Sequence, residues 1–154
     1  DLDQVKLELV DIWHFGLSEM LRSGPVDEAI AAQLSAIEAA DLSASADVRE
    51  EHFRLAIEQL AAACLATRSF DLSSFKLAMA SLPMDLPELH SMYIGKNILN
   101  RFRQNNGYKS GEYRKLWQGR EDNEHLVELL DELSDVVEGL PDKLYAGLEA
   151  RYTA

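Results

Sequence analysis

The sequence predicts an all-α protein, a multi-helix bundle, and three observations support this prediction. β-Branched residues are sparse and nowhere alternate with polar residues over a useful length, so strand signals are nearly absent. Apolar residues recur instead at the spacing of a helix face. The chain has 154 residues and is 47% apolar, which suffices for one full hydrophobic core but not for two. We therefore expect one domain over residues 1–154.

Glycine, proline and short polar runs mark the ends of the predicted helices. Gly24-Pro25 ends the first helix, the polar run 41–47 follows the second, and Pro83 and Pro87 bracket a turn before the fifth. The third helix has an apolar stripe at Phe53, Ile57, Leu60 and Cys64. We expect helices over residues 2–21, from about 27 to the polar run, and over 48–67, 71–81 and 87–103.

A last helix is predicted after the break at residues 104–113. Its apolar stripe consists of Leu126, Leu129, Leu130, Leu133, Val136, Val137 and Leu140. Asp122 or Asn123 can cap its first turn, because both side chains accept hydrogen bonds from backbone N–H groups. We therefore expect one continuous terminal helix over this stripe.

Charge and apolar pattern exclude several classes of protein. With 27 acidic and 15 basic side chains the formal net charge is -12, which repels a long polyanion, so we expect no nucleic-acid partner. No apolar run approaches the roughly 20 residues that cross a bilayer, and the N-terminus has no signal pattern. The single cysteine, Cys64, cannot form an internal disulfide. We expect a soluble, cytoplasmic protein with no membrane partner.

The first predicted helix separates a packing face from a polar face. The packing face carries Val5, Leu9, Ile12, Trp13 and Met20. The polar face spans about 120° and carries Glu8, Asp11, His14, Phe15 and Ser18. Carboxylates at i and i+3, here Glu8 and Asp11, repel unless a cation lies between them. Mg²⁺ suits this position because it prefers oxygen ligands. The alternative is that both carboxylates are simply solvated.

Basic residues gather in the second half of the chain. Seven of the fifteen lie between Lys96 and Arg120, where Glu112 is the only acid. Lys96, Asn100 and Arg103 share one helix face, and a glycine-rich loop follows them. A fixed cationic face beside a flexible loop suits a small number of phosphates. The alternative is a surface lattice of salt bridges, but the presence of a candidate Mg²⁺ site elsewhere in the chain favours a metal-bound polyphosphate.

Two segments of the chain resemble a known enzyme family. ELVDIWHFGLS (8–18) and GKNILNRFRQNNGYKSGEYRKLWQGREDN (95–123) are similar to the dimeric, all-α dUTP pyrophosphatases, or dUTPases. These enzymes are a branch of the all-α nucleoside-triphosphate pyrophosphatase superfamily. The resemblance implies the helical bundle of that superfamily and Mg²⁺-dependent hydrolysis of dUTP to dUMP and pyrophosphate, which controls the dUTP level and supplies dUMP.

The resemblance also implies a role for each matching residue. Glu8 and Asp11, spaced as ExxD, are the implied catalytic carboxylates and Mg²⁺ ligands. His14 is implied to lie near uracil and Phe15 to stack on the deoxyribose. The residues implied at the phosphate end of the substrate are Lys96, Asn100, Arg103, Tyr108, Lys115 and Asn123, and Asn123 is also an implied metal ligand. The implied partners are dUTP, with dUDP as a second ligand, and another copy of the chain in a homodimer.

One feature of the resembled family has no counterpart in the given sequence. That family carries a further acidic pair, spaced ExxE, on a helix before the ExxD helix, whereas only seven residues precede Glu8. Either the dUTPase-like domain lacks that helix or the given sequence begins after it, and in both cases we expect these 154 residues alone to bind Mg²⁺ weakly. Two alternatives remain: a non-catalytic helical module that binds a nucleotide or a protein, and a related pyrophosphatase acting on another nucleotide such as dCTP.

Overall fold

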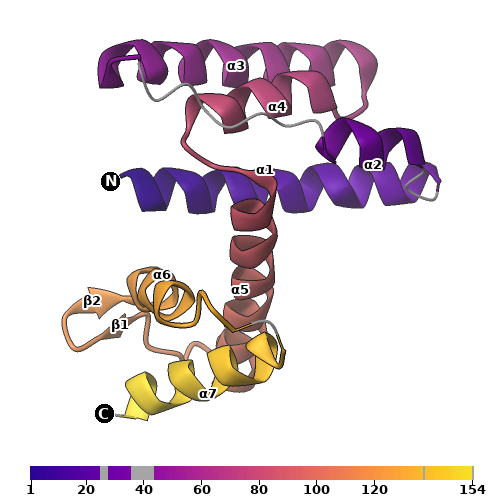
Figure 1. Cartoon of the computed structure of the whole chain (residues 1–154). Coiled ribbons are helices and arrows are strands. Elements are labelled where there is room, and N and C mark those ends of the chain that lie inside the picture. Colours follow the sequence, from indigo (N-terminus) through magenta and orange to yellow (C-terminus); the bar gives the residue numbers. More distant parts are fainter. Residues whose placement is uncertain (25–27, 36–43, 137, 154) are drawn as a thin grey trace. The chain divides into compact units, whose positions relative to one another are not determined.

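The computed structural model confirms an all-α fold (Figure 1). It describes residues 1–24, 28–35, 44–136 and 138–153. Within these ranges the chain forms seven helices and one two-stranded hairpin. In chain order they are α1 (Leu2–Ser23), α2 (Glu28–Ser35), α3 (Ala46–Thr67), α4 (Leu72–Ser81), α5 (Leu86–Asn105), β1 (Leu116–Trp117), β2 (Arg120–Glu121), α6 (Asp122–Glu132) and α7 (Leu140–Thr153).

The chain folds into two compact units, Asp1–Leu89 and His90–Ala154, which we call unit 1 and unit 2. The boundary falls inside α5, so the first turn of that helix belongs to unit 1 and the remainder to unit 2. Each unit is described by itself below. The assignment of residues 1–154 to one domain stays a prediction.

An aromatic cluster beside α1 organises unit 1. Trp13 stacks on Phe75 of α4 with ring centroids 5.2 Å apart, and Phe70 lies 5.4 Å from Phe75. Gly16 lets Phe70 approach α1, because a Cβ at this position would lie 2.5 Å from the Phe70 ring. α3 and α4 run side by side (Figure 1). The turn that joins them is therefore packed against α1 through Phe70.

A short hairpin leads into α6 in unit 2. Trp117 pairs with Arg120, and the two residues between them, Gln118 and Gly119, have φ of 52° and 81°. Positive φ at both positions is typical of the two-residue turn that fits the twist of a hairpin. The core of unit 2 includes Phe102, Trp117, Leu126, Leu129, Leu144 and Leu148, all buried.

The predicted helices over the first two thirds of the chain are confirmed within about two residues at their ends for α1, α3, α4 and α5. In the predicted stripe of α3, Leu60 is buried and the other three residues are half-buried. Residues 36–43, which include the predicted end of the second helix and the start of the polar run, lie outside the described residues. The predicted packing face of α1 is confirmed for Leu9 and Trp13, which are buried, while its other three residues are half-buried.

The prediction of one continuous terminal helix is wrong. α6 ends at Glu132, and a separate α7, absent from the prediction, begins at Leu140. Gly139 lies between them with φ of 71°, a conformation that glycine adopts readily. Pro141 occupies the first turn of α7, where its missing N–H would have no intrahelical partner. The break allows α7 to pack on α6 and bury the apolar stripe of α6.

The start of α6 also differs from the prediction. Its N-cap is Glu121 rather than Asp122 or Asn123, and the Glu121 backbone N–H donates to the Glu124 carboxylate at 2.7 Å. The preceding hairpin was not predicted, because strands of two residues leave no alternating pattern to detect. Asp122 and Asn123 are consequently free of a capping role and lie buried in the first turn of α6.

Candidate functional site

The solvent-facing side of α1 presents two carboxylates and an aromatic ring. Glu8 is exposed, Asp11 is half-buried and Phe15 is 78% exposed. At i, i+3 and i+7 of one helix, these side chains fall within about 60° around the helix axis. A ligand on this face would contact carboxylate oxygens at one end and an aromatic surface at the other.

A cavity of about 360 Å³ opens beside Phe15 within unit 1. It is lined by Ile12, Phe15, Gly16 and Glu19 of α1, by Leu60 and Cys64 of α3, and by Arg68, Ser69 and Phe70 of the following turn. Its volume lies near the lower end of the range of small-ligand pockets. Phe15 lies about one turn after Asp11 on the same face, so the cavity begins about one turn beyond the carboxylates, which do not themselves line it.

His14 lies at the flank of this face. Its Nδ1 is 2.9 Å from the backbone oxygen of Val10, close enough for an Nδ1–H to donate to it, and the ring is half-buried. His14 is not among the residues that line the cavity. The contact between His14 and uracil stays a prediction, and it requires a ligand that reaches around the flank of α1.

The arginines of the basic segment 96–120 are engaged within unit 2. Arg101 and Arg114 each lie over a tyrosine ring of α7, 5.1 and 5.0 Å from the ring centroid. Arg120 forms an ion pair with Glu128 of α6. These three arginines therefore stabilise unit 2. The ion pair of Arg120 agrees with the alternative interpretation of the basic segment as a lattice of salt bridges.

The other predicted phosphate-binding residues differ in exposure. Lys96 is only 4% exposed, whereas Asn100 and Lys115 are exposed and Tyr108 is 52% exposed. Gly107 has φ of 88°, which allows the tight turn that presents Tyr108. The loop after α5 thus places an aromatic hydroxyl and lysine ammonium groups at the surface of unit 2.

Arg103 is clamped by a buried carboxylate. Its Nε and Nη2 both donate to Asp122 at 2.8 Å, and Asp122 is 0% exposed. Nη2 also donates to Asn123 at 3.3 Å, and Nη1 donates to Asn100 at 3.2 Å. These bonds use four of the five N–H donors of a guanidinium. Arg103 can therefore offer a phosphate one further donor, but not a bidentate contact, while the Asp122 pair is intact.

The same carboxylate fixes the loop after α5. The Tyr113 hydroxyl donates to Asp122 at 2.8 Å. Burial and then this hydrogen bond raise the pKa of Tyr113 well above its usual value. Burial lowers the pKa of Arg103, but the hydrogen bond and the charge of Asp122 raise it by more. Asp122 thus holds a protonated phenol and a charged guanidinium at once.

We expect Tyr113 to stay protonated in the folded protein at about pH 11, where free tyrosine is mostly ionised. Because its folded pKa is raised, the stability that Tyr113 contributes is present below about pH 10 and is lost as the pH rises through the folded value. The measurement is a tyrosinate absorbance titration of the wild type minus that of Tyr113→Phe. A step in the difference curve near pH 10, before unfolding, would contradict this expectation.

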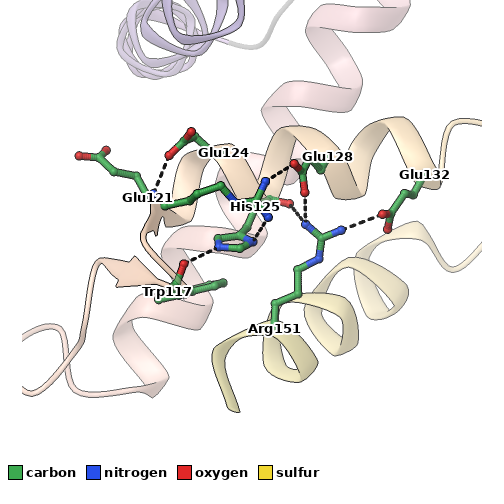
Figure 2. A network of polar contacts seen from close by, with 8 residues as sticks. Trp117, Glu121, Glu124, His125, Glu128, Glu132 and Arg151 are labelled. Atoms are coloured by element: carbon green, nitrogen blue, oxygen red, sulfur yellow. Dashed lines mark hydrogen bonds and ion pairs between the residues drawn. The ribbon is translucent and has the colours of Figure 1, made fainter. Parts of the chain in front are cut away.

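A second polar network fastens α7 to α6, as Figure 2 shows. Arg151 Nη1 donates to Glu128 at 2.8 Å and to the His125 backbone oxygen at 3.2 Å, and Nη2 donates to Glu132 at 2.8 Å. The His125 ring is 0% exposed, and its Nε2 lies 3.0 Å from the Trp117 backbone oxygen. The network holds α6 between the hairpin and α7, which fixes the helix end that carries Asp122.

A family model described as dUTPase matches residues 1–108, more than half of the chain. The chain belongs to the dUTPase family. Its all-α architecture is consistent with the all-α branch that the sequence resembles. Among curated proteins, none matches the chain.

The dUTPase match includes all of unit 1 and the first part of unit 2. Of the predicted site residues, Lys115 and Asn123 lie outside the matched range, and the others lie inside it. No described helix of this dUTPase family member is both long and apolar enough to cross a membrane.

The predicted site residues of this dUTPase family member fall into two groups. Glu8, Asp11 and Phe15 share the exposed face of α1 in unit 1, and Arg103 lies in unit 2 in contact with Asn100 and Asn123. Histidine, cysteine and acidic side chains nowhere form a group of three suited to a metal in the part of the chain that the structure describes. The structure therefore offers the carboxylate pair of α1, rather than a complete cage, for a metal.

Proposed function

We propose that this dUTPase family member hydrolyses dUTP to dUMP and pyrophosphate with Mg²⁺ as its cofactor. The family match supports the substrate. The observation that supports the chemistry is the α1 face, where an acidic pair lies on the same side of the helix as the exposed ring of Phe15, which lines a cavity. Such a face suits a ligand with an anionic, metal-binding end and a ring at the other end.

Glu8 and Asp11 fit Mg²⁺ by their chemistry. Mg²⁺ is usually held by one or two carboxylates together with substrate phosphates and waters, and a closed protein cage is unnecessary. The two side chains provide carboxylate oxygens on one accessible helix face. When bound, Mg²⁺ supplies positive charge that draws the phosphates to this face and favours attack of water at phosphorus.

The residues of the chain have separate roles in the proposed reaction. Water supplies the new oxygen at phosphorus, its proton passes to a carboxylate of α1, and the bond to the pyrophosphate group breaks. Phe15 holds the deoxyribose by an apolar contact. The residues proposed to bind the phosphates are Lys96, Asn100, Arg103, Tyr108, Lys115 and Asn123. Arg103 can make only a single contact with a phosphate, and the side-chain oxygen of Asn123 already accepts a hydrogen bond from Arg103.

We also propose that the chain forms a homodimer. α3 and α4 expose leucines that unit 1 does not cover, with Leu65 83% and Leu77 55% exposed. The terminal apolar stripe contributes less than its sequence pattern indicates, because Leu126 and Leu129 are buried within unit 2. The expected solution mass is that of two chains, and Leu65→Asp should shift it towards one. A monomeric mass for the wild type at micromolar concentration would contradict the proposal.

The test of the proposed reaction is pyrophosphate release from dUTP, with and without Mg²⁺. Release that needs Mg²⁺ supports the proposal, and binding of dUTP without release supports a non-catalytic module instead. Parallel assays with dCTP and dTTP separate a dUTPase from a pyrophosphatase of another specificity. Faster turnover of dCTP than of dUTP would sink the assignment of the substrate.

A further inference from the structure

We propose that Asp122 is a positioning residue for phosphate binding, because it fixes both Arg103 and the loop 106–115 before a substrate arrives. This inference rests on the proposed function, which assigns Arg103 and Lys115 to the phosphates. It adds a residue that acts through others, since the Asp122 side chain is 0% exposed and cannot itself reach a ligand.

Asp122 joins three segments of unit 2. Its two carboxylate oxygens each accept a hydrogen bond from Arg103 of α5 at 2.8 Å. The oxygen that accepts from Arg103 Nε also accepts from the Tyr113 hydroxyl at 2.8 Å. The backbone N–H of Asp122 donates to the Lys115 backbone oxygen at 3.0 Å. One buried residue of α6 therefore holds α5 and the loop that carries Lys115.

The pair with Asp122 gives Arg103 one orientation. Two parallel N–H bonds to one carboxylate fix the plane of a guanidinium as well as its position. Because Nη1 donates to Asn100 and Nη2 to Asn123, the one donor left to Arg103 lies on Nη1. The Arg103 side chain is only 12% exposed. Asp122 thus determines which N–H of Arg103 is left for a phosphate.

The loop after α5 is organised around one carbonyl group and then tied to the same carboxylate. The Gly107 oxygen accepts from the backbone N–H groups of Ser110, Glu112 and Tyr113 at 3.2, 3.0 and 3.4 Å, and from the Ser110 hydroxyl at 3.0 Å. Tyr113 ends this turn, and its hydroxyl donates to Asp122. The backbone on either side of Tyr108 and Lys115 is therefore fastened within unit 2.

A cation that is already in place binds a phosphate at a lower entropic cost than one that must first be ordered. The opposing interpretation is that Asp122 competes with the phosphate for Arg103, since carboxylates and phosphates both accept bidentate contacts from arginine. Positioning is favoured, because a phosphate could displace Asp122 only by leaving a buried carboxylate without its cation.

The two interpretations predict opposite results for Asp122→Asn. The measurement is calorimetric binding of inorganic triphosphate with Mg²⁺ to the full chain, at a temperature at which every variant is folded by circular dichroism. Asp122→Asn should bind triphosphate about 10- to 100-fold more weakly than the wild type, the scale of one charge-assisted hydrogen bond. Equal or tighter binding would overturn the inference.

A matched control separates positioning from stability. Leu144→Ala removes a fully buried side chain of α7 and leaves a cavity in the core of the same unit, so it should also lower the melting temperature. It should nevertheless bind triphosphate within about twofold of the wild type, because it leaves the Asp122 bonds intact. A loss as large as that of Asp122→Asn would show that binding only follows stability, which also overturns the inference.

A double variant tests whether Asp122 acts through Arg103. In Asp122→Asn a misplaced Arg103 should contribute no more than an absent one, so Asp122→Asn/Arg103→Met should bind triphosphate within about threefold of Asp122→Asn. Methionine leaves no buried cation opposite the asparagine. If the second change weakens binding by a further factor of about ten, one hydrogen bond to a charged group, then Arg103 keeps its place without Asp122 and the inference fails.

These outcomes differ from those that test the proposed function. Hydrolysis of dUTP together with wild-type triphosphate binding by Asp122→Asn overturns the positioning role and leaves the reaction standing. Triphosphate binding that depends on Asp122, without any hydrolysis of dUTP, supports the positioning role and overturns the reaction.

Discussion

Asp122→Asn is expected to lower the free energy of unfolding of unit 2 by about 3–5 kcal/mol, the usual cost of breaking a buried ion pair. The Asp122 side chain is fully buried and accepts both 2.8 Å bonds from Arg103 and the Tyr113 hydroxyl. Asparagine keeps the size but replaces one acceptor oxygen with a donor. At least one of these bonds then becomes an unfavourable contact between two donors, beside an uncompensated cation.

Tryptophan fluorescence can follow each unit separately in a denaturant titration. The chain has two tryptophans, with Trp13 in unit 1 and Trp117 in unit 2. In a Trp13→Phe background, the emission of Trp117 reports unfolding of unit 2, and Asp122→Asn should shift its midpoint to lower denaturant. In the complementary Trp117→Phe background, the transition of unit 1 should move less.

The matched control for Asp122→Asn is Glu128→Gln, another carboxylate of α6 that pairs with arginines. The Glu128 side chain is 45% exposed and contacts Arg120 and Arg151, and exposed pairs of this kind contribute at most about 1 kcal/mol. A loss for Asp122→Asn no larger than that for Glu128→Gln would contradict the assignment of Asp122 as the clamp. The double variant Arg103→Met/Asp122→Leu should recover much of the loss, because it leaves no buried charge unpaired.

The sequence predicts most of the fold because helix ends are local events. Gly24-Pro25 and Pro87 act within their own turns, so the adjacent helices can be located without knowledge of the tertiary structure. The region after residue 104 could not be predicted in this way. The apolar stripe continues past the end of α6 at Glu132 through Leu133 and Val136 towards Leu140, and this pattern outweighs the break signals of Gly139 and Pro141.

The candidate site is likewise predictable only where the position of a side chain follows from its own helix. The exposed positions of Glu8 and Phe15 follow from helix periodicity, since both lie on the side opposite the buried Trp13. The partner of Arg103 does not follow from periodicity, because Asp122 lies 19 residues away and reaches it only through the fold. The left-handed cap of α3 at Arg68 likewise has no sequence signal, since a left-handed cap is usually glycine.

Asp11→Asn is expected to lower kcat/KM for dUTP by about 100- to 1,000-fold, the scale of losing one charge contact to a phosphate transition state. The change keeps the side-chain size and removes one of the two charges that the α1 face offers to Mg²⁺. Helicity should be unchanged, because the position is half-buried on an accessible helix face and the loss of repulsion from Glu8 slightly favours the helix. Pyrophosphate release and circular dichroism measure the two effects.

A readout without turnover keeps this last prediction separate from a general loss of folding. If the carboxylate pair binds Mg²⁺, adding the ion should raise the melting temperature of the wild type and have less effect on Asp11→Asn, because a ligand stabilises only the state that binds it. Asp3→Asn is the matched control, since it removes an exposed carboxylate from the first turn of the same helix but leaves the pair intact. It should retain both the activity and the Mg²⁺-dependent shift. If Asp11→Asn hydrolyses dUTP within about threefold of the wild type, less than 1 kcal/mol in the barrier, then the reaction does not depend on this pair and the catalytic assignment of α1 is wrong.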